Sequence, residues 1–325
     1  MAGSNNQELN RGMQVPSSIQ RLKVVVVAGP TAVGKTALSI EIAQRFGGEV
    51  INADSRYLYQ GFDIGVDKPA ISERLGVPHH LIDVLPASGE MSLARYQDLA
   101  YAAIENVAAR GRLPILAGGT PQYINAVVEG WHIPRVPPDP SFRGRSQAEA
   151  AFDGGRSLML RLRDVDPLSA DRCGSNLRRV IRALEVYEAT GVPMSAQEGK
   201  GPPPYDTLEL GLFRPREALF QVIDQRIVEQ IDRGLVQEVE ALLAAGVPAT
   251  APAMSSFGYR QLLPYLAGEV SLEHAVERIR FDTHRYVRHQ ETWLRKNPRL
   301  VRIDVDTDRW REDTMTLVKS FLDDN

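Results

Sequence analysis

Cysteine is nearly absent from this chain of 325 residues, in which Cys173 is the single cysteine. An intramolecular disulfide and a cysteine-based zinc site are therefore excluded. No apolar run approaches the roughly 20 residues that a membrane-spanning helix requires, and no hydrophobic signal segment follows the polar N-terminus. We therefore expect a soluble, cytoplasmic protein without a membrane partner, and nothing in the sequence demands more than a monomer.

Lysine is also scarce, since 32 of the 38 basic residues are arginine, and the net charge of −3 hides an uneven distribution. Between Arg135 and Arg182, ten arginines face six acids. Between Arg278 and Arg302, eight basic residues face two acids. Such stretches fit a polyanionic partner bound on one face. Solvated helix faces in an arginine-rich protein are the simpler explanation, so the charge pattern alone leaves the function open.

Short apolar runs alternate with segments of helical periodicity along most of the chain. Residues 1–21 are polar and without periodicity, and we expect them to form a disordered tail. We then expect strands over 22–27, 49–53, 113–117 and 208–213, and helices over 37–46, 93–110, 215–233, 235–245 and 271–296. This alternation predicts an α/β fold with a parallel sheet flanked by helices.

Two proline-rich segments interrupt this pattern. Residues 131–140 contain four prolines and residues 199–204 are a Gly/Pro run, so both resemble linkers or hinges. The sequence between them is arginine-rich and has helical periodicity. We therefore predict a catalytic α/β core, formed by residues 22–134 and 205–325, with an inserted all-helical domain over 135–204.

A phosphate-binding loop follows the first predicted strand. Its pattern, Gly29-x4-Gly34-Lys35-Thr36, lies between an apolar strand and a helix, which is the context that a P-loop requires. The glycines allow backbone N–H groups to converge on phosphate oxygens at a helix N-terminus. Lys35 adds a positive charge, and the Thr36 hydroxyl is a ligand for Mg²⁺. The predicted diphosphate site comprises Gly29, Pro30, Thr31, Ala32, Val33, Gly34, Lys35 and Thr36.

Polar residues follow two other predicted strands. Asp54 ends the second strand and Thr120 the third, and ligands of open α/β sheets gather at such strand ends. Asp54 is therefore a candidate general base, although an Asp-Ser pair is also a common helix N-cap. Thr120 is likewise either a functional residue at a strand end or only a helix cap. No guanine-reading Asn-Lys-x-Asp segment exists in the chain, which argues against a GTPase and leaves small-molecule kinases open.

Taken together, the chain from about Val24 to Arg295 resembles the bacterial tRNA dimethylallyltransferases, also called tRNA isopentenyl pyrophosphate transferases. The segments that carry the resemblance are the phosphate loop, Asn52-Ala53-Asp54-Ser55, Asp63-Ile64-Gly65, Pro78-His79-His80-Leu81-Ile82-Asp83, Gly118-Gly119-Thr120, Arg179-Val180-Ile181-Arg182-Ala183-Leu184-Glu185-Val186, Gly258-Tyr259-Arg260 and Gln290 with Thr292-Trp293. The phosphate loop is shared with many families, whereas the other segments in this order are far more specific.

The resemblance implies transfer of a dimethylallyl group from dimethylallyl diphosphate to the exocyclic amine of the adenosine immediately 3′ of the anticodon, in tRNAs reading codons that begin with U. It implies catalytic roles for Asp54, Thr120 and Lys35, and places Arg226 at the diphosphate with Mg²⁺ at Thr36. The anticodon stem-loop contacts that it implies are Asp54, Ser55, Arg56, Tyr57, Thr120, Arg143, Arg178, Arg179 and Arg182.

The sequence departs from the family pattern at several positions. Arg56-Tyr57 replaces the usual Met-Gln, so Tyr57 is expected to stack on a base where the family uses a hydrogen bond. Val66-Asp67 replaces Thr-Ala, Pro121-Gln122 replaces Gly-Leu, and Arg178 replaces Gln. His79 and His80 are adjacent on a strand and point to opposite faces, so we expect them to pack or to form supporting hydrogen bonds, and not to bind a metal.

Three alternatives remain at this point. An adenylate isopentenyltransferase would use the same donor but would modify free AMP, ADP or ATP. A P-loop kinase would transfer a phosphoryl group from ATP to a small metabolite and would not need RNA. A nucleotide-switched RNA-binding protein would leave Asp54 and Thr120 without a role. The Arg179-x-x-Arg182 pair in the arginine-rich insertion favours a large RNA acceptor.

Overall fold

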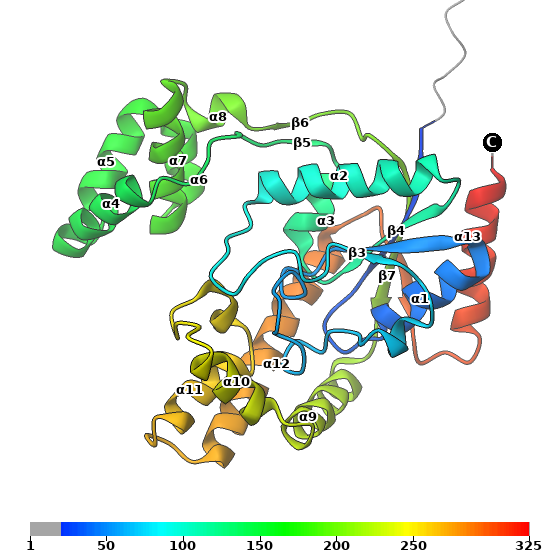
Figure 1. The fold of residues 1–325 in the computed structure, drawn as a ribbon. Helices are drawn as coiled ribbons and strands as arrows, with labels where there is room; N and C mark the ends of the chain where they lie inside the picture. The colour runs from blue at the N-terminus through cyan, green and yellow to red at the C-terminus, as the bar shows by residue number, and fades with distance from the viewer. Residues whose placement is uncertain (1–20, 325) are drawn as a thin grey trace, which may run out of the picture.

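The computed structural model describes residues 21–324 (Figure 1). The predicted tail over residues 1–21 lies outside the described residues, except for Arg21. None of the described helices is long and apolar enough to cross a membrane. The central feature is a six-stranded parallel sheet in the order β3-β2-β4-β1-β7-β8. Its strands are β1 Lys23–Ala28, β2 Gly48–Asn52, β3 His79–His80, β4 Leu113–Gly118, β7 Asp206–Phe213 and β8 Val301–Asp304.

Strand β1 lies in the middle of the sheet and its residues from Val24 to Ala28 have no exposed surface. Its neighbours are β4 on one side, with Val25 opposite Ile115, and β7 on the other, with Val25 opposite Leu208. Because helices cover both faces of the sheet, β1 is a continuous run of apolar residues and does not alternate between apolar and polar.

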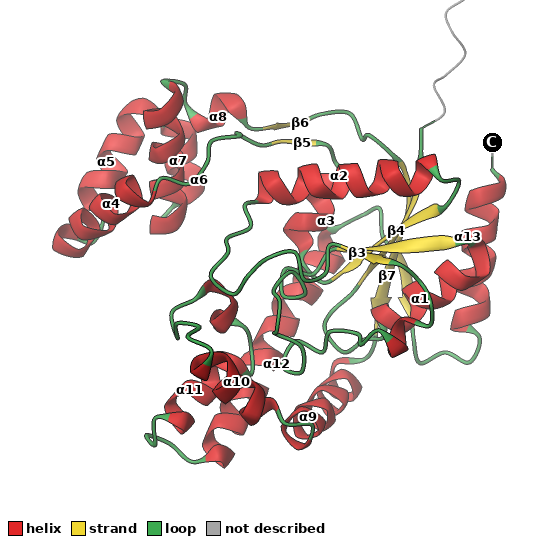
Figure 2. Ribbon diagram, in the orientation of Figure 1, coloured by secondary structure: helices red, strands yellow, loops and turns green. Residues whose placement is uncertain are grey.

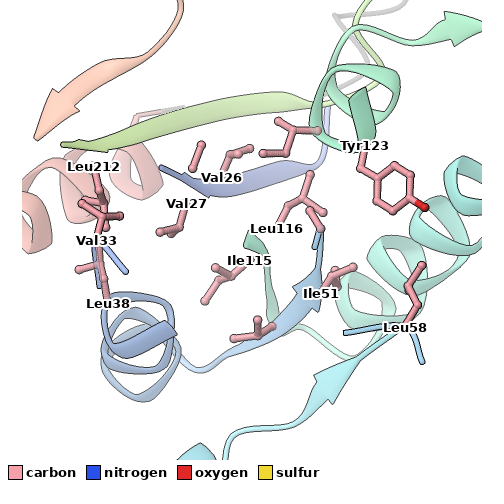
Figure 3. Packing of buried hydrophobic residues seen from close by; sticks show 14 of the residues in the cluster. Val26, Val27, Val33, Leu38, Ile51, Leu58, Ile115, Leu116, Tyr123 and Leu212 are labelled. Atoms are coloured by element: carbon pink, nitrogen blue, oxygen red, sulfur yellow. The ribbon is translucent and has the colours of Figure 1, made fainter. Parts of the chain in front are cut away.

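Helices α1 (Lys35–Phe46) and α13 (Trp310–Asp323) cover one face of the sheet, and α2 (Leu93–Ala109) and α3 (Pro121–Val128) cover the other. Figure 3 shows the buried layer, with Leu38 of α1 on one side of Ile115 and Leu116, and Tyr123 of α3 on the other. The predicted α/β fold with a parallel sheet is therefore confirmed. The edge strand β8 and the helix α13 behind it were not predicted.

The insertion is a separate helical lobe that projects from the sheet domain (Figures 1 and 2). Its helices are α4 Pro140–Asp153, α5 Arg156–Val165, α6 Pro167–Cys173, α7 Leu177–Thr190 and α8 Met194–Gln197. It has its own core, in which Leu158, Leu162 and Leu184 are almost fully buried. The lobe thus lies within the interval 135–204 that the sequence marks as an insertion.

The two segments expected to be linkers are paired with each other. Strand β5 (Trp131–His132) runs antiparallel to β6 (Gly199–Lys200), with Trp131 opposite Lys200. The lobe is therefore connected to the core by a short two-stranded neck (Figure 2). The composition of the two segments predicted linkers or hinges. Their pairing could not be predicted, because composition carries no information on contacts between segments so far apart in the chain.

A second group of helices follows β7 and lies below the sheet in Figure 1. It comprises α9 Arg216–Asp232, α10 Leu235–Ala244, α11 Tyr259–Leu266 and α12 Leu272–Lys296, with the short 3-10 helix η2 Pro252–Ser255; a further 3-10 helix, η1 Ser72–Arg74, precedes β3. Helix α12 packs against both α9 and α11. Its C-terminal half returns to the end of β1, where the phosphate loop begins.

Candidate active site

The phosphate loop occupies residues 29–34, between the end of β1 and the start of α1. Gly34 has a φ of 103° and Ala32 a φ of 66°, both in the left-handed region; this conformation is favourable for glycine and costs free energy for alanine. At Gly29 a Cβ would lie 2.8 Å from Val33 Cγ1 and 3.0 Å from the Leu212 carbonyl oxygen. A side chain there would therefore separate the loop from β7.

Lys35 is held inside this loop. Its Nζ donates a hydrogen bond of 2.7 Å to the Pro30 carbonyl oxygen. Burial is the main cause that lowers the pKa of Lys35; the negative charge of Asp54 opposes this shift, the positive charge of Arg226 adds to it, and the resulting pKa is about 8. The ammonium thus faces a carboxylate and a guanidinium, and an anionic ligand would favour its charged form.

The loop is also fixed by a residue far away in the sequence. Gln290 of α12 accepts a hydrogen bond from the Thr31 N–H at 3.1 Å, and its Nε2 donates to the Gly119 carbonyl oxygen at 2.8 Å. Gln290 is 4% exposed. Sequence reasoning did not include it among the site residues, and its only signal was its place in a segment that resembles the family.

Asp54 lies where β2 leaves the sheet. The Asn52 side chain accepts a hydrogen bond from the Asp54 N–H at 2.8 Å, and Asp54 Oδ1 accepts one from the Arg56 N–H at 2.9 Å. A turn and not a helix follows, so the alternative reading of Asp54 as a helix N-cap is wrong. In the described part of the chain no hydrogen bond engages Oδ2 of Asp54, which leaves this oxygen for a ligand.

Thr120 lies beside Asp54 because β2 and β4 are neighbouring strands. The Ala53 N–H donates to the Ala117 carbonyl oxygen at 2.7 Å, and the Thr120 N–H donates to the Ala53 carbonyl oxygen at 3.2 Å. Thr120 precedes α3 but makes no capping bond with its side chain. Its Oγ1 instead accepts from the Ser55 N–H at 3.0 Å. The threonine thus fixes the turn that carries Asp54.

Two cavities meet at Asp54. The smaller, of about 30 Å³, is lined by Lys35, Thr36 and Tyr57 as well as Asp54. The larger, of about 300 Å³, is in the size range of small-molecule sites, and its lining includes Asp54 together with Thr31, Arg56, Arg226, Arg260 and Tyr286. Arg260 and Tyr286 were not predicted as site residues, because only the packing of α11 and α12 brings them to the sheet.

Asp67 explains how Arg226 is held in this larger cavity. The Asp67 carboxylate lies 3.0 Å from Arg226 on α9 and 3.0 Å from Arg233. Its loop is tied to α10 and α11, since Ile64 N–H donates to Glu238 at 2.9 Å and Gly65 N–H to the Tyr259 hydroxyl at 3.2 Å. The departure from Ala to Asp at position 67 thus adds a partner for Arg226.

Tyr57 does not lie as expected. Its hydroxyl donates a hydrogen bond of 2.9 Å to the Asp67 carbonyl oxygen, and burial together with the charges of Asp54 and Asp67 raises its pKa. The side chain lines the small cavity beside Lys35 and Thr36. It is therefore held against the phosphate loop by its paired hydroxyl, which differs from the stacking position expected for it. Arg56 points the other way and donates to Ser255 Oγ at 3.1 Å.

The remaining predicted RNA contacts lie on the insertion. Arg178 and Arg179 are exposed in the first turn of α7. Arg143 of α4 and Arg182 of α7 line a cleft of about 550 Å³ where the insertion meets the core. Gln122, two residues after Thr120, lines the same cleft. These arginines are therefore separate from the phosphate loop, and a large substrate would be needed to contact both.

The described residues contain no group of three or more His, Cys, Asp or Glu side chains that could hold a metal ion. His79 Nδ1 donates to the Val77 carbonyl oxygen at 2.9 Å, and His80 Nε2 lies 2.7 Å from Glu49, so both imidazoles form hydrogen bonds within the fold. Oxygen donors do meet in the small cavity, where Thr36 and Asp54 both line the wall. Such a donor set fits Mg²⁺, which keeps several waters and shares phosphate oxygens.

The parallel sheet and its curled phosphate loop, with Lys35 inside and a carboxylate at the next strand end, define a protein of the P-loop class. Comparison with known proteins then gives the family, because residues 57–297 match the model of the IPP transferase family. The chain belongs to this family, the tRNA dimethylallyltransferases. This confirms the resemblance drawn from the motifs.

Individual relatives agree with this assignment. A tRNA dimethylallyltransferase of Thermomicrobium roseum is 51% identical over 93% of this chain and 92% of its own length. The full-length tRNA isopentenylpyrophosphate transferase structure from Bacillus halodurans has 35% identity and a TM-score of 0.70, covering 93% of this chain and 97% of that one. A eukaryotic dimethylallyltransferase acting on tRNA has 30% identity and a TM-score of 0.75, covering 92% of this chain and 77% of that one.

Proposed function

We propose that this enzyme transfers the dimethylallyl group of dimethylallyl diphosphate to the N6 amine of the adenosine immediately 3′ of the anticodon, in tRNAs that read codons beginning with U. The products are N6-dimethylallyladenosine and diphosphate. The observation that carries the proposal is the position of Asp54, which lines both the small cavity at the phosphate loop and the larger cavity beside it. One carboxylate can therefore serve an acceptor that approaches a bound diphosphate ester.

The donor half of the reaction depends on the phosphate loop. The loop N–H groups, the Lys35 ammonium and the Arg226 guanidinium bind the diphosphate. As the allylic C1–O bond breaks, its electron pair moves to the departing diphosphate, whose negative charge these groups stabilise. Lys35 is well placed for this role, because its hydrogen bond to Pro30 keeps its Nζ at the centre of the loop.

The acceptor half depends on Asp54 and Thr120. The N6 nitrogen attacks C1, a C–N bond forms, and the N6 proton passes to the Oδ2 of Asp54. Thr120 accepts a hydrogen bond from Ser55 and so holds the turn that presents this carboxylate. The target base has to leave the anticodon-loop stack to reach the cavity, as in other enzymes that modify a base.

Mg²⁺ is the cation that we propose for this site, with the Thr36 hydroxyl as its protein ligand. When bound, it neutralises part of the charge on the leaving diphosphate. The oxygen donors that line the small cavity support this choice. We further propose that the enzyme works as a monomer in the cytoplasm, where its tRNA substrate is found.

The anticodon stem-loop would contact the core through Asp54, Ser55, Arg56 and Thr120, and the insertion through Arg143, Arg178, Arg179 and Arg182. The insertion would thus be the tRNA-binding domain. Because the insertion is separate from the phosphate loop, only an acceptor much larger than a free nucleotide can contact both. The arginines of the insertion would add affinity through the RNA backbone, without reading the sequence. This arrangement favours tRNA over AMP as the acceptor.

A label-transfer assay tests the proposal. Purified protein, Mg²⁺ and labelled dimethylallyl diphosphate are offered unmodified tRNA in one tube and AMP in another. We expect label in tRNA, and none when the adenosine 3′ of the anticodon is replaced. Label in AMP alone would identify an adenylate isopentenyltransferase. Label in neither would reopen the P-loop kinase and RNA-binding-switch alternatives and withdraw the role of Asp54.

A further inference from the structure

Glu185 is a charged side chain buried in the insertion. It lies on α7, is 2% exposed and faces the connection between the neck and α4. A buried carboxylate is stable only when hydrogen bonds and opposite charges compensate for its lost hydration. The residues that supply this compensation are two of the arginines proposed to bind tRNA.

Four N–H groups converge on the Glu185 carboxylate. Arg143 donates from Nε at 2.8 Å and from a terminal nitrogen at 3.0 Å. Arg182 donates at 2.6 Å, and the backbone N–H of Asp139 donates at 2.8 Å. Both carboxylate oxygens are thus occupied. The bidentate contact to Arg143 fixes the plane of its guanidinium as well as its position.

Arg182 has a further function in this cluster, because it also donates to the Val136 carbonyl oxygen at 2.9 Å. It thereby ties α7 to the segment that leads from the neck into α4. The side chains of Arg143 and Arg182 nevertheless keep about 32% and 24% of their surface exposed, and both line the cleft between insertion and core. Each guanidinium therefore has one side on Glu185 and one side open to the cleft.

A second carboxylate touches the same cluster from the core. Glu90 precedes α2, is 62% exposed, and lies 3.6 Å from Arg143. An exposed ion pair of this length contributes little to stability. A phosphate group in the cleft would readily displace Glu90 from Arg143, whereas the same phosphate group could not displace the buried Glu185.

We propose that Glu185 is a positioning residue for tRNA binding, which holds Arg143 and Arg182 with their free N–H groups directed into the cleft between the insertion and the core. The inference rests on the proposed tRNA-binding function of these two arginines. Glu185 itself does not touch the RNA. Its effect is to fix two long side chains before the substrate arrives, so that binding does not have to order them.

The test measures the dissociation constant of the unmodified tRNA for four variants of the full chain. These are Glu185→Gln, the double variant Arg143→Ala/Arg182→Ala, the triple variant that combines them, and Glu90→Gln as the matched control. We expect Glu185→Gln to weaken tRNA binding about tenfold, the order expected when two ordered side chains become free. In the arginine-free background the same change should have no further effect. Glu90→Gln should leave binding unchanged or tighten it.

Further measurements separate positioning from a loss of folding. Pyrophosphate affinity should stay normal in every variant, because the phosphate loop is distant from Glu185, and Glu185→Asp should recover part of the tRNA affinity. An added loss from Glu185→Gln in the arginine-free background would indicate a merely structural role and overturn the inference. Normal or tighter tRNA binding by Glu185→Gln, with weak binding by the double arginine variant, would also overturn it. Normal binding by the double arginine variant would instead refute the proposed RNA contacts.

Discussion

At the scale of single residues, the fold lowers the pKa of Lys35, which the position of this lysine in the motif does not reveal. The motif requires only a positive charge near phosphate oxygens. The structure places this charge in a partly buried position near Arg226 and Asp54, with a pKa of about 8. The ammonium is therefore mostly charged at pH 7 and is neutralised within a pH range in which the protein can be studied.

Pyrophosphate binding should consequently depend on pH. A bound anion favours the protonated form of Lys35 and raises its pKa, so binding above pH 8 requires the uptake of a proton. We expect the affinity for inorganic pyrophosphate to be steady near pH 7 and to fall above pH 8, by up to about tenfold per pH unit. Calorimetry from pH 7 to 9.5 measures this. Lys35→Arg, which stays charged throughout, should lack the decline; an identical decline would show that another group titrates.

Asp54 is the second residue whose function can be separated from its structural role. In Asp54→Asn the side-chain oxygen still accepts from the Arg56 N–H, but the amide cannot take a proton. We expect the rate of label transfer in a single turnover to fall about 10²–10⁴-fold, with tRNA affinity nearly unchanged. Asp83→Asn is the matched control, because Asp83 follows the neighbouring strand and lies 2.6 Å from Lys68. Equal losses of rate and affinity in Asp54→Asn would make Asp54 a binding residue.

At the scale of secondary structure elements, α12 ties together the loops that follow two strands of the sheet. Its residue Gln290 links the phosphate loop to the end of β4 through Thr31 and Gly119. The helix also contributes Tyr286 to the larger cavity. The two polar groups that Gln290 connects lie in the loops that follow β1 and β4, which are adjacent in the sheet, so this side chain sets the separation of these loops.

Replacing Gln290 should loosen the phosphate loop without changing the affinity for tRNA. Gln290→Leu leaves the Thr31 N–H and the Gly119 carbonyl without their partner, at a cost of about 1–3 kcal/mol for a buried group. We expect a lower melting temperature and a several-fold higher KM for dimethylallyl diphosphate, with unchanged tRNA affinity. Thr292→Ala, on the exposed side of the same turn, is the control. An unchanged KM in Gln290→Leu would show that the loop holds its shape without α12.

At the scale of the whole molecule, the enzyme consists of a sheet domain and a helical lobe that are joined by a narrow neck (Figure 1). The lobe has its own hydrophobic core. Substrate binding can therefore move it relative to the sheet without breaking either core. The exposed arginines at the start of α7 form no ion pair with other described residues, which leaves them available for phosphates.

The salt dependence of tRNA binding tests this arrangement. Each phosphate contact that is removed reduces the slope of log affinity against log salt concentration by roughly 0.7–0.9. Arg178→Ala/Arg179→Ala should therefore weaken tRNA binding and flatten this slope by about one to two units. Filter binding between 50 and 300 mM salt measures both. A weaker affinity with the original slope would mean that the pair acts through folding, and an unchanged affinity would place the RNA elsewhere on the lobe.

Much of this arrangement could be predicted, because it depends on local patterns. The apolar run of β1, the glycine-rich loop and the start of α1 are adjacent in sequence, and chain geometry alone brings them together. Parallel strands also end at one edge of their sheet, which is why Asp54 and Thr120 could be expected side by side. The helical periodicity of the insertion needed no tertiary information either.

Other features depend on contacts between distant segments, which no local pattern encodes. The pairing of β5 with β6, the addition of β8 at the sheet edge, and the side-chain direction of Tyr57 all belong to this group. So do the bridge from Gln290 to Thr31 and the cluster around Glu185. The sequence by itself determined the class of fold, the phosphate loop and the strand-end residues, because short-range backbone preferences and apolar periodicity specify them. Only the tertiary structure decided which distant side chains support these residues, because their partners are set by how the helices pack.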